Sequence, residues 1–170
     1  MTYYIFRHGE TYFSKNEVPY GENIESAEIL PEAIPAIKKL AEFLKGKGID
    51  AYYSSPYLRC RQTTKMFSEI ISKDFIFYEN LGEFRRERET IEEFILRTKG
   101  FLESLKKKDY KNIAICTHGY VVSALRELVL QGFVQKERLD DYPKTGVIMH
   151  IENGEAAYVD FNNQNAPTTP

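Results

Sequence analysis

The chain has 170 residues, with 23 lysines and arginines against 25 aspartates and glutamates, so its formal charge at pH 7 is −2. This balance excludes the strongly basic surface that attracts nucleic acids or anionic membranes. Apolar residues make up 42% of the chain, which excludes a disordered protein. Two cysteines are too few for a disulfide framework and indicate a reducing compartment, and the first apolar run lacks the basic flank of a signal peptide. We therefore expect a cytoplasmic protein.

The apolar pattern predicts strands that alternate with helices. Buried strands are predicted at four short runs of aromatic and β-branched residues: 3–6, 51–54, 75–78 and 113–116. Helices are predicted where apolar residues recur at helical spacing: 31–46, 56–71, 90–107 and 121–131. The Asn-Gly pair at 153–154 predicts a closing hairpin over 147–161. We expect an α/β fold with one three-layer α/β/α domain over 1–161, a mostly parallel sheet with an antiparallel C-terminal hairpin, and a polar, flexible tail at 162–170.

Polar side chains follow all four predicted parallel strands. They comprise two imidazoles, two guanidiniums, one carboxyl and two hydroxyls: Arg7, His8, Ser55, Arg59, Glu83, Thr117 and His118. In an open α/β sheet, ligands bind outside the carboxyl ends of the strands. Taken singly, each residue is more often a structural histidine or a surface charge. Their shared position at one edge of the sheet predicts an anion site with an acid.

Metal and nucleotide sites are weaker interpretations. A catalytic zinc site needs three protein ligands, and the third histidine, His150, lies in the predicted hairpin, where we expect a structural role. Neither a P-loop nor a dinucleotide-binding glycine pattern is present in the sequence. The lysines at 106–108 are expected to form a solvated helix end. We therefore expect no bound metal.

Four sequence blocks resemble those of the histidine phosphatase superfamily, the phosphoglycerate mutase-like proteins. They are Arg-His-Gly-Glu-Thr at 7–11, the second-arginine block at 54–63, Leu-Gly-Glu-Phe at 81–84 and Thr-His-Gly at 117–119. The order and spacing of these blocks carry the resemblance from residue 3 to about residue 151. It agrees with the fold that the apolar pattern predicts.

This resemblance implies that His8 is a nucleophile that is transiently phosphorylated and that Glu83 is the proton donor. It implies a phosphoryl-binding set of three residues: Arg7, Arg59 and His118. Further substrate contacts are expected at three positions: Ser14, Gly21 and Gly119. Guanidiniums suit this role because a phosphoryl group in transfer spreads its charge over its equatorial oxygens. Neither a cofactor nor a metal is implied, and the alternative for Glu83 is a surface carboxylate paired with an arginine at 85 or 86.

Departures from the family pattern favour a hydrolase. Ser14 replaces the usual Asn, and only residues 84–89 separate the acid block from the next helix, where classical mutases carry a long lid. Without a lid, water can reach the intermediate. We expect a phosphatase acting on a small phosphorylated metabolite or a phosphorylated protein; the alternatives are a phosphoglycerate-type mutase and a catalytically weak phospho-ligand binding module. The oligomeric state stays open.

The connection at 84–89 also contains three arginines, Arg85, Arg86 and Arg88, that alternate with two glutamates. They could bind a second anionic group of a substrate or face water. Alternating charges are more typical of a solvated surface, which we take as the expectation.

Overall fold

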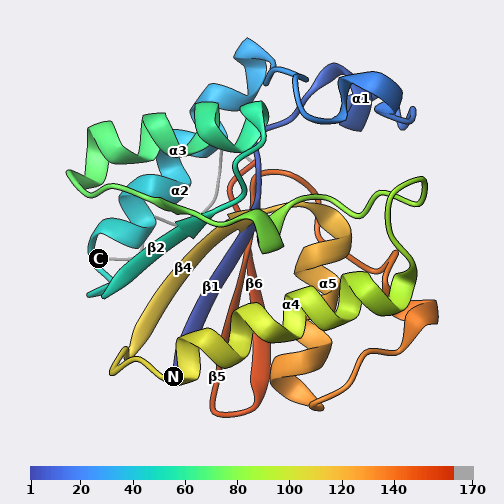
Figure 1. Ribbon diagram of the computed structural model, residues 1–170. Coiled ribbons are helices and arrows are strands. Elements are labelled where there is room, and N and C mark those ends of the chain that lie inside the picture. Colours follow the sequence, from blue (N-terminus) through green and yellow to red (C-terminus); the bar gives the residue numbers. More distant parts are fainter. Residues whose placement is uncertain (163–170) are drawn as a thin grey trace.

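A computed structural model describes residues 1–162, which form one six-stranded sheet in the order β3-β2-β4-β1-β5-β6 (Figure 1). Its parallel strands are β1 (Thr2–Arg7), β2 (Ala51–Ser54), β3 (Ile76–Phe77) and β4 (Asn112–Thr117). The hairpin of β5 (Val147–Glu152) and β6 (Glu155–Asp160) joins β1 in antiparallel orientation. The predicted sheet, with its closing hairpin, is thereby confirmed. Apart from Asn162, the predicted tail lies outside the described residues, and the domain boundary at 161 stays a prediction.

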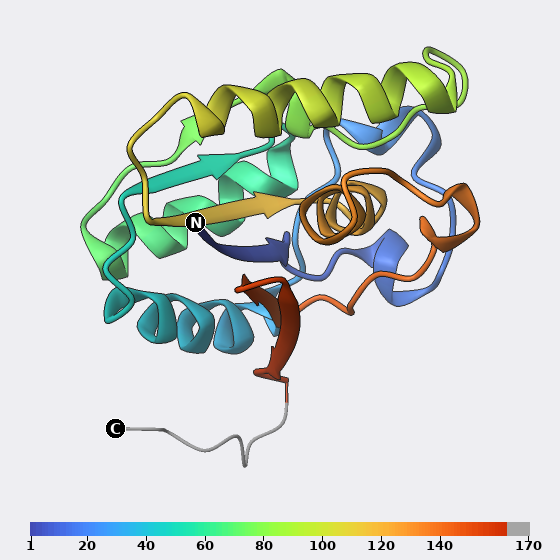
Figure 2. The same ribbon diagram turned by 90° about the horizontal axis from the view of Figure 1, so that it is seen from below.

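Helices cover both faces of this sheet, as Figure 2 shows. α2 (Ile34–Lys45) and α3 (Leu58–Ile71) pack on one face, and α4 (Ile91–Lys106) and α5 (Gly119–Leu130) pack on the other. The predicted three-layer arrangement is confirmed. No helix in the described part of the chain is long and apolar enough to cross a membrane.

β1 separates two hydrophobic cores. Tyr3 and Ile5 face the core beneath α4 and α5, whereas Tyr4 and Phe6 face the core beneath α2 and α3. Successive strand residues point to opposite faces of a sheet, so β1 is buried on both sides. This explains why its sequence is continuously apolar instead of alternating.

Local sequence signals set several element ends. Thr90 and Glu93 form the predicted capping box at the start of α4, each side chain accepting the other residue's backbone N–H.

The predicted strand at 75–78 is wrong in its extent, because only Ile76 and Phe77 pair with β2. The Phe75 side chain is buried among the rings of the α2/α3 core instead. The polar loop 9–29 contains two short helices, α1 (Tyr12–Lys15) and η1 (Gly21–Ile24).

Three parallel strands end side by side, and this places the polar side chains that follow them. Arg7 in β1 is in register with Thr117 in β4, and Ser54 in β2 is in register with Cys116. Beyond the strands, the His8 N–H donates to the Thr117 carbonyl over 3.0 Å. The pairing of β1 with β4 therefore continues past the end of β1, and the residues that follow the strands lie together at one edge of the sheet.

Candidate active site

His8 is buried at this edge, and a single hydrogen bond fixes its tautomer. Its Nδ1 lies 2.8 Å from the Gly9 carbonyl oxygen, which can only accept, so Nδ1 carries the proton. Nε2 therefore keeps its lone pair, and this buried atom has no hydrogen-bond partner. Burial, reinforced by the charges of Arg59 and Arg7, lowers the pKa of His8 well below its usual range. The ring is thus neutral with one unengaged basic nitrogen.

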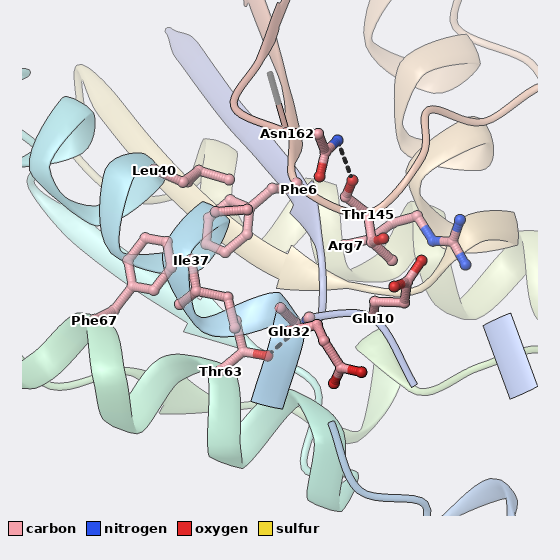
Figure 3. Close-up of a pocket in the computed structure, with 14 residues that line it drawn as sticks. Phe6, Arg7, Glu10, Glu32, Ile37, Leu40, Thr63, Phe67, Thr145 and Asn162 are labelled. Atoms are coloured by element: carbon pink, nitrogen blue, oxygen red, sulfur yellow. Dashed lines mark hydrogen bonds between the residues drawn. The ribbon is translucent and has the colours of Figure 1, made fainter. Parts of the chain in front are cut away.

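The turn behind His8 requires a glycine. The Gly9 N–H donates to Thr63 Oγ1 over 2.8 Å, and a Cβ on Gly9 would lie 2.6 Å from Ile37 Cδ1. A small cavity of about 50 Å³ adjoins this turn (Figure 3). Its inner wall consists of four apolar side chains: Phe6, Ile37, Leu40 and Phe67. A space of this size admits little more than water, so it is not a substrate site.

Arg59 and His118 form a second buried pair. Arg59 has no exposed surface, and its Nη2 donates to His118 Nδ1 over 2.9 Å while its Nη1 donates to the Ile24 carbonyl. A guanidinium can only donate, so His118 carries its proton on Nε2, which lies 2.7 Å from Ser55 Oγ. Burial and the Arg59 charge lower the pKa of His118 well below its usual range. The two histidine rings lie 5.3 Å apart between centroids.

Glu83 approaches this pair from the other side. Its Oε2 lies 3.9 Å from Arg59 Nη2 and 3.7 Å from His118 Nδ1, and its Oε1 accepts the Phe84 N–H over 3.2 Å. Burial raises the pKa of Glu83, although the Arg59 and Arg7 charges oppose the shift. Glu83 is therefore not the surface carboxylate of the alternative interpretation, because its charged neighbours belong to the predicted site.

Arg7 completes the set of five predicted core residues. Its guanidinium lies 4.8 Å from the centre of the Tyr142 ring, and its Nη1 donates to the Pro143 carbonyl over 3.3 Å. Like Arg59 Nε, Arg7 Nε is buried and lacks a hydrogen-bond partner. Native proteins rarely leave such atoms unsatisfied. The Nε atoms of Arg7 and Arg59 are thus two hydrogen-bond donors without acceptors, and His8 Nε2 is one acceptor without a donor.

A broad cleft of about 1740 Å³ opens beside these residues. Arg7 and Glu83 line it, whereas His8, Arg59 and His118 have no exposed surface. The three predicted substrate contacts also line it, each with a structural role: Ser14, Gly21 and Gly119.

Those structural roles differ. Ser14 Oγ accepts the Thr11 N–H over 2.9 Å in the capping box of α1. Gly21 has a φ of +51° at the start of η1, a conformation that favours glycine. A Cβ on Gly119 would lie 2.8 Å from the Tyr142 ring. All three therefore shape the wall of the cleft.

Tyr20 is a site residue that the sequence analysis missed. Its ring lies 4.2 Å from the Arg59 guanidinium carbon and 6.4 Å, edge to face, from the His8 ring. Its hydroxyl is 2.8 Å from Thr11 Oγ1, and its other side lines the cleft. Tyr20 thus lies between the cleft and the buried histidine. The only sequence signal was an aromatic residue within a polar loop.

Arg97 is a second missed residue. From α4 it donates to both Glu89 oxygens, over 2.8 and 2.7 Å, to the Asn80 carbonyl over 2.7 Å and to the Glu83 carbonyl over 3.3 Å. It therefore fixes the backbone on both sides of the acid. The available signal was its position three residues after Phe94, next to the buried face of the predicted helix.

Comparisons with known proteins agree with this geometry. A family model described as histidine phosphatase superfamily (branch 1) matches residues 3–86, which contain Arg7, His8, Arg59 and Glu83. Nearly half of the chain thus matches the histidine phosphatase superfamily. A curated relative from Hydrogenobacter thermophilus, named "Putative phosphoserine phosphatase 2", is 25% identical over 155 residues, which cover 72% of this chain and 75% of the relative.

Solved structures of two phosphatases share the fold of this chain. The alpha-ribazole phosphatase of Shigella flexneri superposes with a TM-score of 0.72 at 17% identity, covering 100% of both chains. The protein histidine phosphatase SixA, complexed with tungstate, gives a TM-score of 0.65 at 16% identity, covering 93% of this chain and 94% of SixA. These likenesses extend over nearly the whole chain, so the shared fold includes the part beyond residue 86.

Proposed function

We propose that this protein is a metal-independent phosphatase that hydrolyses phosphomonoesters, or a phosphorylated protein side chain, through a phosphohistidine on His8. The observation that carries the proposal is the set of three buried, unpartnered atoms: His8 Nε2, Arg7 Nε and Arg59 Nε. One is a nucleophile and two are cationic donors, which is what a phosphoryl group requires. The phosphatase names of the relatives support hydrolysis of phosphate esters.

In the first step, His8 Nε2 attacks phosphorus in line and the bond from phosphorus to the ester oxygen breaks. The equatorial oxygens accept hydrogen bonds from the two arginines, which stabilise the developing charge. Glu83 protonates the leaving oxygen, a role favoured by burial, which raises its pKa and so increases the protonated share of the carboxyl. In the second step water attacks the phosphohistidine, Glu83 accepts the water proton, and inorganic phosphate leaves with His8 neutral again.

Access of the ester to His8 requires the Tyr20 ring to move. The ring packs on Arg59 and lines the cleft, so a phosphate that reaches His8 has to take over part of its place. Tyr20 is held by a hydroxyl contact to Thr11 and by packing of its ring against Phe13 and Arg59. Such contacts are exchanged readily for a charge-assisted bond between phosphate and Arg59.

The arginines supply the positive charge in this proposal. Among residues 1–162, no group of three or more histidine, cysteine, aspartate or glutamate side chains is arranged to hold a metal ion. The short connection at 84–89 also favours hydrolysis over mutase activity. It lines the cleft and is held by ion pairs of Arg97 with Glu89 and of Arg85 with Glu25.

The decisive experiment traps the intermediate. Wild-type protein quenched during turnover of p-nitrophenyl phosphate should carry an acid-labile, base-stable phosphoryl group on His8. His8→Ala should lose both the label and the activity, whereas His150→Gln, in the hairpin outside the site, should keep both. A label on Ser55, or His8→Ala activity within about tenfold of wild type, would overturn the covalent mechanism.

A further inference from the structure

The three arginines of the connection at 84–89 have different partners. Arg85 is only 12% exposed; its Nη1 forms an ion pair with Glu25 and its Nε lies 3.4 Å from Glu87. Arg88 also pairs with Glu25, over 3.5 Å. These two side chains tie the connection to the loop 9–29, so their charges are already used within the protein.

Arg86 is the exception. Its side chain is exposed at the cleft, and its one hydrogen bond among residues 1–162 runs over 3.3 Å from Nη2 to the Tyr120 hydroxyl. That hydroxyl is also hydrogen-bonded to Asp140, so a carboxylate reaches Arg86 only through a neutral phenol. A guanidinium has five N–H donors, and most of those on Arg86 point to no protein acceptor.

An aromatic wall connects Arg86 to the phosphate site. The Arg7 guanidinium packs over Tyr142, the Tyr142 and Tyr120 rings lie 6.0 Å apart, and Tyr120 reaches Arg86 through its hydroxyl. Phe84 extends the same surface, 5.7 Å from Tyr120. All of these residues line one cleft. A phosphate ester bound at Arg7 would lay a flat or apolar body along this wall and place its far end near Arg86.

We propose that Arg86 and the Tyr120–Tyr142 wall form a subsite for a second anionic group, such as a carboxylate, at the end of the substrate remote from the phosphate. The proposal rests on the phosphatase function proposed above. The planar guanidinium binds a carboxylate through two parallel N–H bonds, which a neutral amide cannot match. The subsite thus selects phosphate esters that carry a distal acid.

The test uses two aryl phosphates with the same phenol leaving group: 3-(4-phosphonooxyphenyl)propanoate and its propanamide. Wild-type kcat/KM should be about tenfold higher for the acid, the effect expected of one charge-assisted hydrogen bond at an exposed site. Arg86→Met should reduce this ratio to near one. Arg88→Met, the matched control, removes an equal charge from the same connection and should keep the ratio.

Each outcome bears on the subsite or on the reaction. A ratio near one in wild type, or an equal fall in both variants, would overturn the subsite. Failure of wild type to release phosphate from either ester would instead overturn the proposed phosphatase function. A third ester with a terminal phosphonate tells which anion is preferred, and either preference supports the subsite if Arg86→Met removes it.

Discussion

His8 can attack phosphorus only as a neutral ring, and its burial predicts a measurable dependence of stability on pH. The pKa of His8 is lowered well below 6.5 by burial and by two arginines, and that of His118 is lowered likewise. In the unfolded chain both rings protonate near pH 6.5. Below that pH the unfolded state therefore binds more protons than the folded state, and the protein loses stability as the pH falls.

The slope follows from linkage. Each histidine that is protonated only in the unfolded state changes the free energy of unfolding by about 1.4 kcal/mol per pH unit, so the pair contributes about 2.7 kcal/mol per unit below pH 6.5. Glu83 acts in the opposite direction, because its raised pKa makes the folded state bind a proton first as the pH falls. Its offset, at most about 1.4 kcal/mol per pH unit, applies between pH 4.5 and its raised pKa.

Urea unfolding measured from about pH 7.5 to about pH 5 tests this reasoning. His8→Asn should reduce the slope below pH 6.5 by about 1.4 kcal/mol per pH unit, whatever its effect on absolute stability. Glu83→Gln should make the slope steeper in its own window, since the offset is removed. Equal slopes for wild type and His8→Asn would mean that the pKa of His8 is the same in both states, and the lowered pKa inferred from its burial would have to be abandoned.

Three further predictions concern the reaction. Glu83→Gln should slow alkyl phosphates by about 10²- to 10⁴-fold but barely affect p-nitrophenyl phosphate, whose phenolate needs little protonation; equal losses would remove Glu83 as the acid. Phosphate release should persist in EDTA and be inhibited competitively by vanadate, whereas metal rescue after chelation would contradict the arginine-based site. Arg97→Met should lower kcat for alkyl phosphates and leave KM nearly unchanged, because Arg97 positions Glu83. Arg97→Lys should recover part of the lost kcat. A change in KM alone would contradict the positioning role.

Sequence periodicity predicts the sheet well because every residue of a central strand is buried and is therefore apolar. Residues 3–6 lie between two cores, and the sequence there is continuously apolar. The strand predicted at 75–78 is present but shorter, Ile76–Phe77, because an edge strand has one neighbour and little burial. Phe75 is more stable inside the core than in an extended pairing, and sequence pattern does not separate these two environments.

The residues at the strand ends were predictable for a topological reason. Parallel strands deliver the residues that follow them to one edge, so His8, Ser55 and His118 meet there whatever the loops do. Tyr20 and Arg97 reach the site through loop conformation and helix orientation, which no local pattern encodes. Their contacts with Arg59 and with the Glu83 carbonyl depend on how distant segments pack.

The charged connection at 84–89 contacts the loop that carries Tyr20. Its alternating charges favoured a solvated surface, yet Arg85 and Arg88 both pair with Glu25, about sixty residues earlier. Glu25 directly follows Ile24, whose carbonyl accepts a hydrogen bond from Arg59, so these ion pairs hold the loop that carries Tyr20 close to Arg59. Glu25 is 56% exposed, and ion pairs at a protein surface contribute about 0 to 1 kcal/mol each. The connection thus joins the acid block to the loop that carries Tyr20, the side chain that has to move in the proposed mechanism.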